Sequence, residues 1–197
     1  GGDLILAGDD FTIQEIFEFP FVVSAGSFFQ VNNGAAERLV SVLLDSLPLN
    51  SDQMVLDLYC GVGLFSLFLA QEVDRVIGVE ASHDAAQDFL YNLRDFENVE
   101  LYDLPVEEVL PYLKLQPDII ILDPPRAGIP PEVLDDVVRL QSDWIAYISC
   151  DPATLGRDIR RFSSQGYSLE NSTPVDMFPQ TYHIESLNIL KKNPRQE

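Results

Sequence analysis

One stretch, Met54 to Ala70, constrains the fold of this chain more than any other. It reads MVLDLYCGVGLFSLFLA, which is a short apolar run, two glycines one residue apart, and about two helical turns of apolar residues. This order predicts a buried strand, a glycine turn and a helix. Gly61 and Gly63 let the backbone turn sharply and approach a ligand, because no Cβ is in the way. The N-terminal end of the next helix offers free N–H groups and a positive dipole.

The same stretch leaves two interpretations open. A dinucleotide-binding fingerprint has a third Gly or Ala three residues after Gly63, where this chain has Ser66. A nucleotide-cofactor loop and an ordinary glycine turn of an α/β core therefore remain alternatives until other residues are considered.

Strands and helices alternate after this stretch. The apolar pattern predicts strands at 75–80, 99–102, 118–122 and 144–149, and helices at 82–93, just after Pro105, at 131–141 and from Pro152. The buried face of the helix at 82–93 is expected to carry Ala85, Ala86, Phe89, Leu90 and Leu93. Two further strands, 167–175 and 185–190, follow. This alternation predicts an α/β fold with a doubly wound, mostly parallel sheet.

The first part of the chain has a different pattern. Leu4–Ala7 and Phe11–Phe17 flank Gly8-Asp9-Asp10 and predict a β-hairpin, and Phe21–Ser24 predicts another short strand. We expect residues 1–26 to form an N-terminal hairpin extension, the remnant of an upstream domain, and residues 27–197 to form the main domain. A helix at about 39–47 precedes the central stretch.

Composition excludes several classes of protein. The chain has 197 residues, 46% of them hydrophobic, which suffices for one well-buried domain. Its net charge of −20, from 12 basic and 32 acidic residues, argues against binding a polyanion through bulk electrostatics. No apolar run is long enough to span a membrane. Two cysteines and two histidines predict neither a disulfide framework nor a metal centre, and we expect a cytoplasmic location.

Chemically unusual residues follow four of the predicted strands. The first core strand ends at the glycine loop, the second at Glu80, the fourth at Asp123-Pro124-Pro125-Arg126, and the fifth at Ser149-Cys150-Asp151. Glu80 follows Gly61 by 19 residues, close to the spacing of about 20 at which a carboxylate reaches the hydroxyls of a bound ribose. Since parallel strands end at one rim of the sheet, these residues predict a single ligand site there.

Cys150 is the candidate nucleophile. Asp151 can cap the helix that opens at Pro152, and a helix N-terminus stabilises a thiolate. Arg157, Arg160 and Arg161 lie on one face of that helix and would add positive potential or contact phosphate. The alternatives are an inert buried thiol and a solvated basic face. Cys60, inside the strand end of the glycine loop, is expected to serve only packing.

Together these segments resemble the catalytic domain of the S-adenosylmethionine-dependent RNA uracil-5-methyltransferase family. The resemblance runs from about Ser24 to Leu190 and is carried by three motifs: Ser27-Phe28-Phe29-Gln30-Val31-Asn32; Asp123-Pro124-Pro125-Arg126-Ala127-Gly128 with Tyr147 to Thr154; and Asp176 to Glu185. It implies a Rossmann-like class I methyltransferase fold.

The resemblance also implies roles for individual residues. Gln30, Tyr59, Glu80 and Asp123, beside Gly61 and Gly63, would bind S-adenosylmethionine. Cys150 would be the nucleophile and Glu185 the base. Arg126, Phe178 and Arg157 would contact the substrate, a uridine in tRNA or rRNA. Family members bind RNA largely through upstream domains, which fits the acidic charge of this chain. Asp151 stands where the family commonly has Asn, and Pro105 lies at the adenine side of the expected site.

Four other functions remain as alternatives. An NAD-dependent oxidoreductase would use the glycine loop and Glu80 but has no role for Cys150. A methyltransferase acting on an exocyclic amine usually has an aromatic residue where Arg126 stands. A cytosine-5 RNA methyltransferase would also use Cys150. A non-catalytic cofactor-binding scaffold is the fourth.

Overall fold

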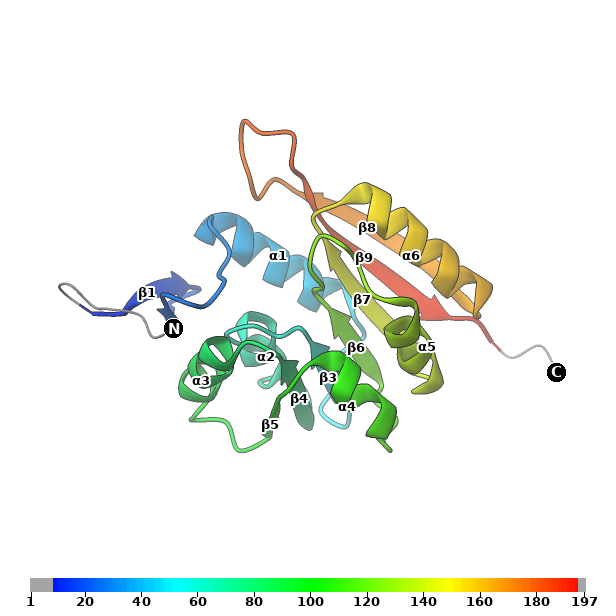
Figure 1. The fold of residues 1–197 in the computed structure, drawn as a ribbon, viewed down its shortest axis with the longest axis horizontal. Helices are drawn as coiled ribbons and strands as arrows, with labels where there is room; N and C mark the ends of the chain where they lie inside the picture. The colour runs from blue at the N-terminus through cyan, green and yellow to red at the C-terminus, as the bar shows by residue number, and fades with distance from the viewer. Residues whose placement is uncertain (1–8, 195–197) are drawn as a thin grey trace.

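The computed structural model describes residues 9–194, and its core is one seven-stranded sheet with helices on both faces (Figure 1). The strands are β1 (Phe11–Ile16), β2 (Phe19–Ser24), β3 (Met54–Leu58), β4 (Arg75–Glu80), β5 (Val99–Asp103), β6 (Ile119–Leu122), β7 (Trp144–Ser149), β8 (Tyr167–Val175) and β9 (Glu185–Lys192). The helices are α1 (Asn33–Ser46), α2 (Leu64–Leu69), α3 (His83–Asn92), α4 (Val106–Val109), α5 (Pro131–Arg139) and α6 (Pro152–Ser164), with a 3₁₀ turn at Leu110–Tyr112.

The strand order confirms a doubly wound, mostly parallel sheet. The order is β5-β4-β3-β6-β7-β9-β8. The chain first adds β4 and β5 on one side of β3 and then adds β6 and β7 on its other side. Strands β3 to β7 pair in parallel, while β9 pairs antiparallel with both β7 and β8. The carboxyl ends of β3, β4, β6 and β7 therefore share one rim, and β9 begins at the same rim because it runs the other way.

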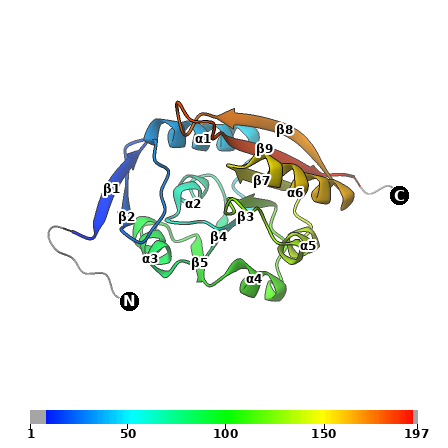
Figure 2. The ribbon, with the colours of Figure 1, turned by 45° about the horizontal axis from the view of Figure 1, so that its top comes forward.

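Alternating side chains of the buried strands build two apolar cores. Val55, Val76 and Ile121 face α1, α2 and α3, whereas Leu56, Ile77 and Ile120 face α4, α5 and α6. Figure 2 shows the two groups of helices on opposite sides of the sheet. Both faces of β3 and β6 are buried, which explains why β6 is continuously apolar and β3 is apolar except for Asp57, instead of alternating.

The N-terminal hairpin differs from the expected one. β1 pairs with β2 through a two-residue turn at Phe17 and Glu18, whose φ angles are 48° and 68°. Two consecutive positive φ angles are typical of a type I′ hairpin turn, which usually contains Asn or Gly, so sequence signals missed it. The expected partner strand at Leu4–Ala7 lies outside the described residues.

The hairpin packs on the main domain through α2 and α3. The Asp88 carboxylate of α3 accepts hydrogen bonds from the Ser24 amide at 2.8 Å and from the Ser24 hydroxyl at 2.7 Å. Asn92 exchanges two hydrogen bonds with the backbone of Val22. The ring of Phe68 in α2 makes edge contacts with Phe17 and Phe19. A domain boundary at residue 26 remains a prediction.

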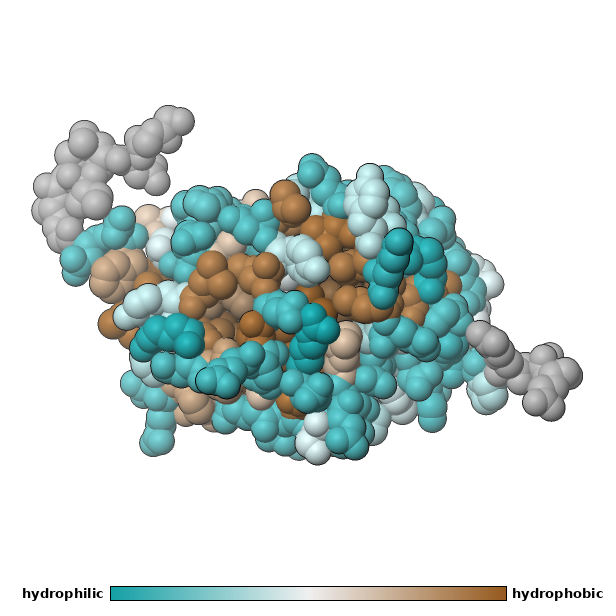
Figure 3. Space-filling view, turned by 90° about the horizontal axis from the view of Figure 1, so that it is seen from below, coloured by the Kyte–Doolittle hydropathy of each residue, from teal (hydrophilic) through white to brown (hydrophobic). Residues whose placement is uncertain are grey.

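The α3 helix begins as expected, because the Ser82 hydroxyl accepts from the Ala85 amide. One residue of its predicted buried face is wrong: Leu90 is 51% exposed, since the sheet and the hairpin cover only the side that carries Ala86 and Phe89. Within residues 9–194 no helix has the length and apolarity to cross a membrane. Figure 3 shows hydrophobic residues gathered in the middle of one face, inside a largely hydrophilic surface.

Candidate active site

A cavity of about 460 Å³ opens where the strands end. It takes residues from the ends of β3, β4, β6 and β7, from the start of β9, and from two loops, 26–30 and the one that contains Phe178. The structure thus brings together nine of the residues singled out from the sequence: Gln30, Tyr59, Gly61, Glu80, Asp123, Arg126, Cys150, Phe178 and Glu185.

The two glycines of the loop have different roles. Gly61 lines the cavity with φ +54°, and apart from its two neighbours in the chain no described residue has an atom within 4 Å of where its Cβ would be. Gly63 does not line the cavity. With φ +92°, its Cβ would overlap Leu93 and lie 2.9 Å from Phe89 Cδ2, so this glycine allows α3 to pack closely against the loop. A contact of Gly63 with the cofactor therefore remains a prediction.

The helix after the loop is short and fully buried. α2 has six residues, too few for a strong terminal dipole, and all six are buried. Ser66, which breaks the dinucleotide fingerprint, donates a hydrogen bond of 2.6 Å to Asp57 Oδ2 in β3. Asp57 is completely buried, and this burial raises its pKa to about 7. Ser66 thus satisfies one oxygen of a carboxyl group beneath the glycine loop.

Glu80 organises the backbone around the cavity. Its two carboxylate oxygens accept hydrogen bonds from the Gly61 amide at 2.9 Å and from the Ser82 amide at 2.7 Å. Each carboxylate oxygen has a second lone pair, which remains available to a donor inside the cavity. Glu80 is therefore placed to accept from the hydroxyls of a ribose, as its spacing from Gly61 predicts.

The 26–30 segment forms another wall, held by α3. The hydroxyl of Ser27 donates to Asp88 at 2.6 Å, next to the Ser24 bonds that anchor β2. Gln30 is 7% exposed, and its Oε1 has no hydrogen-bond partner among the described residues. A buried amide oxygen without a partner costs free energy unless a ligand supplies a donor.

Cys150 and Glu185 lie opposite one another because of strand register. β7 and β9 pair antiparallel with Ser149 opposite Ser186, so one further step brings Cys150 opposite Glu185. The two residues are 35 positions apart in the chain, and the pairing of β7 with β9 brings them to the same rim of the sheet. Ser186 reinforces the junction by donating from its hydroxyl to the Ser149 carbonyl at 3.3 Å.

The ionisation of Cys150 differs from what the sequence predicts. Burial raises the pKa of the thiol and the Glu185 carboxylate raises it further, while the Arg126 side chain opposes them. The N-terminus of α6 does not decide the direction of this shift. The expectation that it lowers the pKa of Cys150 is therefore wrong. Asp151 caps α6 as predicted: its carboxylate accepts from the Ala153 and Thr154 amides at 2.8 and 3.0 Å.

The cavity is strongly acidic. Burial raises the pKa of Glu185 to about 7, and the Arg126 guanidinium opposes that shift. Burial also raises the pKa of Asp123 well above its usual value, and the nearby Glu185, Asp57 and Glu80 carboxyls raise it further. Closely spaced carboxylates repel one another when they are ionised, so a cationic ligand would reduce this repulsion.

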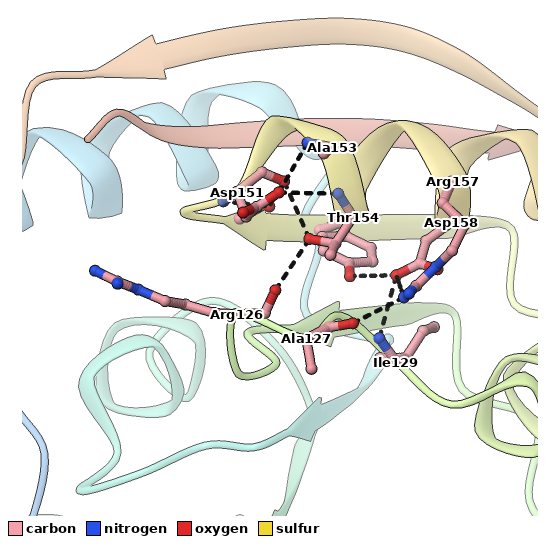
Figure 4. Close-up of polar contacts among 10 residues, drawn as sticks. Arg126, Ala127, Ile129, Asp151, Ala153, Thr154, Arg157 and Asp158 are labelled. Atoms are coloured by element: carbon pink, nitrogen blue, oxygen red, sulfur yellow. Dashed lines mark hydrogen bonds and ion pairs between the residues drawn. The ribbon is translucent and has the colours of Figure 1, made fainter. Parts of the chain in front are cut away.

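Arg157 does not reach this cavity. Its Nε donates to Asp158 Oδ1 at 2.9 Å, and its Nη2 donates to the Ala127 carbonyl at 2.9 Å (Figure 4). The positive charge that acts on Cys150 comes from Arg126 instead. The spacing of the arginines along α6 gives no indication of this. Arg157 lines a separate hollow with Arg161 beside Gly128, and a contact with RNA there remains a prediction.

Several residues of the site were missed from the sequence. Phe28, Phe29, Val62 and Phe65 line the cavity as apolar walls, and Ser82 lies beside Glu80. The adjacent Phe28 and Phe29, which are unusual in an exposed loop, were the available signal. Pro105 does not line the cavity. Among the described residues, no cluster of three or more His, Cys, Asp or Glu is arranged to hold a metal ion.

The cavity fits the cofactor that the sequence resemblance implies. Gln30 Oε1 offers an unused acceptor, Glu80 offers carboxylate oxygens for ribose hydroxyls, and Gly61 leaves open space at the loop. The acidic walls suit a ligand that carries a sulfonium and an ammonium group. They are unfavourable for the two phosphates of a dinucleotide, since Glu80, Asp123 and Glu185 line the same space.

Comparison with known proteins adds independent findings. The family model described as tRNA (uracil-5-)-methyltransferase matches residues 14–193. An uncharacterized RNA methyltransferase of Caldanaerobacter subterraneus is 37% identical over 191 residues, which cover 96% of this chain and 42% of the relative. One from Synechocystis is 39% identical over 191 residues, with 95% and 41% covered. The chain thus spans about two fifths of the length of these relatives.

A solved structure shares the fold. The crystal structure of the Pyrococcus abyssi tRNA (uracil-54, C5)-methyltransferase in complex with S-adenosyl-L-homocysteine superimposes with a TM-score of 0.80 at 29% identity, covering 93% of this chain and 45% of that one. The family match spans nearly the whole chain and includes every wall of the cavity from Gly26 to Glu185. The chain belongs to the tRNA (uracil-5-)-methyltransferase family.

Proposed function

We propose that this chain is the catalytic domain of an enzyme that transfers a methyl group from S-adenosylmethionine to carbon 5 of a uridine in tRNA or rRNA. The observation that carries the proposal is one cavity in which a thiol and a carboxyl group, Cys150 and Glu185, face the residues that suit a nucleoside cofactor. The family match and the tRNA methyltransferase structure of Pyrococcus abyssi support it.

The cofactor would be held by Gln30, Gly61 and Glu80, with Asp123 and Tyr59 beside it. S-adenosylmethionine would supply a methyl group bound to a cationic sulfonium: a nucleophilic carbon takes the methyl group, and the C–S bond breaks so that S-adenosylhomocysteine leaves as a neutral thioether. Asp123 follows β6 between Glu80 and Glu185, and its carboxyl is influenced by both. A cation in this position would favour the ionised form of Asp123, so binding should be accompanied by proton release.

Cys150 would activate the ring. Carbon 5 of uracil is too weak a nucleophile to take a methyl group unaided. Attack of the Cys150 thiolate on carbon 6 forms an S–C bond and moves the electron pair of the 5,6 double bond toward the carbonyl oxygen, which gives an enolate. Carbon 5 is nucleophilic in that adduct. Arg126 lines the cavity with Cys150 and opposes the rise of its pKa, so this side chain helps to supply the thiolate.

Glu185 would complete the reaction. After methyl transfer, carbon 5 carries both a proton and a methyl group, and removal of the proton restores the double bond while the C–S bond breaks. The electron pair of the C–S bond returns to Cys150 as thiolate. Glu185 has a pKa raised to about 7, which suits a base that accepts a proton near neutral pH. Its position opposite Cys150 in the β7–β9 register supports this role.

The proposal is tested in the longer parent protein with RNA and labelled S-adenosylmethionine. We expect 5-methyluridine in the product. Cys150→Ala should abolish turnover and any covalent RNA adduct. Glu185→Gln should stop turnover but trap a methylated RNA–protein adduct on a denaturing gel. Methylation by Cys150→Ala, normal turnover by Glu185→Gln, or 5-methylcytidine as the product would overturn the proposal.

RNA binding would depend mainly on parts of the parent protein outside this chain. The net charge of −20 opposes a phosphate backbone, and three of the few basic side chains, Arg157, Arg160 and Arg161, lie together on α6. Arg126 and Phe178 line the cavity and would contact the target base itself. We place the enzyme in the cytoplasm, where tRNA and rRNA are modified.

A further inference from the structure

The loop that carries Arg126 is tied to one face of α6 by three side chains. Thr154 Oγ1 donates to the Arg126 carbonyl at 3.1 Å, Arg157 Nη2 donates to the Ala127 carbonyl at 2.9 Å, and Asp158 Oδ2 accepts from the Ile129 amide at 3.1 Å. Figure 4 shows these contacts as a row between the helix and the loop. The backbone from the Arg126 carbonyl to Ile129 is therefore held from α6.

Asp158 is the centre of this row. It is completely buried, and its carboxylate also accepts from the Tyr147 hydroxyl of β7 at 2.9 Å and from two guanidinium nitrogens of Arg157. At Gly128, with φ +72°, a Cβ would overlap Asp158 Oδ2, so the loop approaches the carboxylate too closely for a residue with a side chain. A buried, fully bonded carboxylate of this kind holds its neighbours in one geometry.

The same helix also presents the nucleophile. Cys150 directly precedes the Asp151 cap of α6, so the thiol lies just before the helix, and the helix holds the Arg126 loop one to two turns after it. The charged groups that face the thiol are Arg126 from this loop and Glu185 from β9, with Asp151 next to it in the chain. Glu185 raises the pKa of the thiol and Arg126 lowers it, so a small displacement of Arg126 changes that pKa.

We propose that Asp158 is a positioning residue, which, together with Arg157 and Thr154, holds the loop so that the Arg126 side chain lines the cavity beside Cys150. The proposal deepens the proposed function, because it rests on Cys150 as the nucleophile. Asp158 does not touch the cavity, and it acts only through Arg126.

The test measures the thiol directly on this 197-residue chain, without RNA or cofactor. The rate of iodoacetamide alkylation is followed from pH 6 to pH 10, and the Cys150 peptide is quantified by mass spectrometry so that Cys60 does not interfere. Below the pKa, each rise of the pKa by one lowers the thiolate fraction, and with it the rate, about tenfold. Asp158→Asn keeps the shape of the side chain and removes its charge.

Asp158→Asn should slow alkylation of Cys150 at pH 7.5 about three- to tenfold and move the pH profile upward. Arg126→Ala should do the same, and Asp158→Asn should then have no further effect in the Arg126→Ala background. An equal slowing in both backgrounds would show a merely structural role and overturn the proposal, as would no slowing. The control is Arg160→Ala, an exposed charge on the same helix, which should leave the profile unchanged.

A second variant keeps the test decisive if Asp158→Asn does not fold. Thr154→Val removes the hydroxyl, which lies 3.1 Å from the Arg126 carbonyl and 3.1 Å from the Asp151 carbonyl, and it is expected to shift the profile in the same direction by a smaller amount. A Thr154→Val profile identical to that of the wild type would then overturn the proposal. Because no methyl transfer is measured, a failure of the proposed reaction is distinguishable from a failure of this inference.

Discussion

The two glycines of the central loop give the sharpest prediction, because Gly63 is packed against α3 whereas Gly61 lines the cavity. Replacing Gly63 by Ala places a side chain at φ +92°, which costs about 1–2 kcal/mol for an L-residue in the left-handed region. The new Cβ also overlaps Leu93 and crowds Phe89 in the buried core, which costs about 1–3 kcal/mol more. The expected loss of unfolding free energy is therefore about 2–5 kcal/mol.

Gly61→Ala is the matched comparison. It meets the same kind of backbone strain at φ +54° but open space around its Cβ, so the expected loss is only about 1–2 kcal/mol. Its methyl group would lie at the cavity, so this variant should lose more affinity for S-adenosylmethionine than Gly63→Ala does. Gly156→Ala, inside α6 with no described atom within 4 Å, is the control and should gain up to about 1 kcal/mol.

Urea unfolding followed by circular dichroism measures the stabilities, and calorimetry measures the affinities. For a domain of this length each kcal/mol corresponds to about 2–4 °C in the melting temperature, so Gly63→Ala should melt about 4–20 °C lower. The reasoning is refuted if Gly61→Ala is as destabilising as Gly63→Ala, or if Gly63→Ala is the variant that loses more affinity.

Three further predictions concern charge. Glu80→Ala should weaken S-adenosylmethionine binding by about 1.5–3 kcal/mol, the scale of a hydrogen bond to a charged group, and unchanged affinity by calorimetry would contradict the assignment. The folded chain holds a proton on Asp57 up to a pKa of about 7, while the ordinary pKa is 3.8. The folded state thus binds more protons in this window, and its stability should fall as pH rises from about 4 to about 7, by at most about 1.4 kcal/mol per pH unit. Asp57→Asn should make that fall smaller but not abolish it, because the pKa values of Asp123 and Glu185 are also raised. An equal fall of unfolding free energy with pH in wild type and variant, measured by urea unfolding, would disprove the prediction. Finally, this chain alone should bind unmodified RNA more weakly than about 10⁻⁴ M at physiological salt, because its net charge is −20, and tight binding in a filter assay would contradict this.

Local chemistry explains which features were predictable from the sequence. The strand β4 was predicted with the bounds that the structure has, and the cap of α6 by Asp151 was predicted as well. Both depend on residues within a few positions of one another: an apolar run that must be buried, and a carboxylate that satisfies free amides of a helix. The convergence of strand ends was predictable too, since it follows from the parallel connections alone.

The tertiary structure decided what depends on contacts between distant segments. It made Gly63 a packing residue, because α3 returns from thirty positions away to cover it, and it turned Arg157 toward Asp158 and away from the cavity. The direction of the pKa shift of Cys150 likewise could not be predicted from the sequence. Burial, Glu185 and Arg126 together set the pKa of the thiol, and the two side chains meet it only through sheet register and a loop held by α6. Electrostatic effects act through space, so their sign is known only when the fold places the charges.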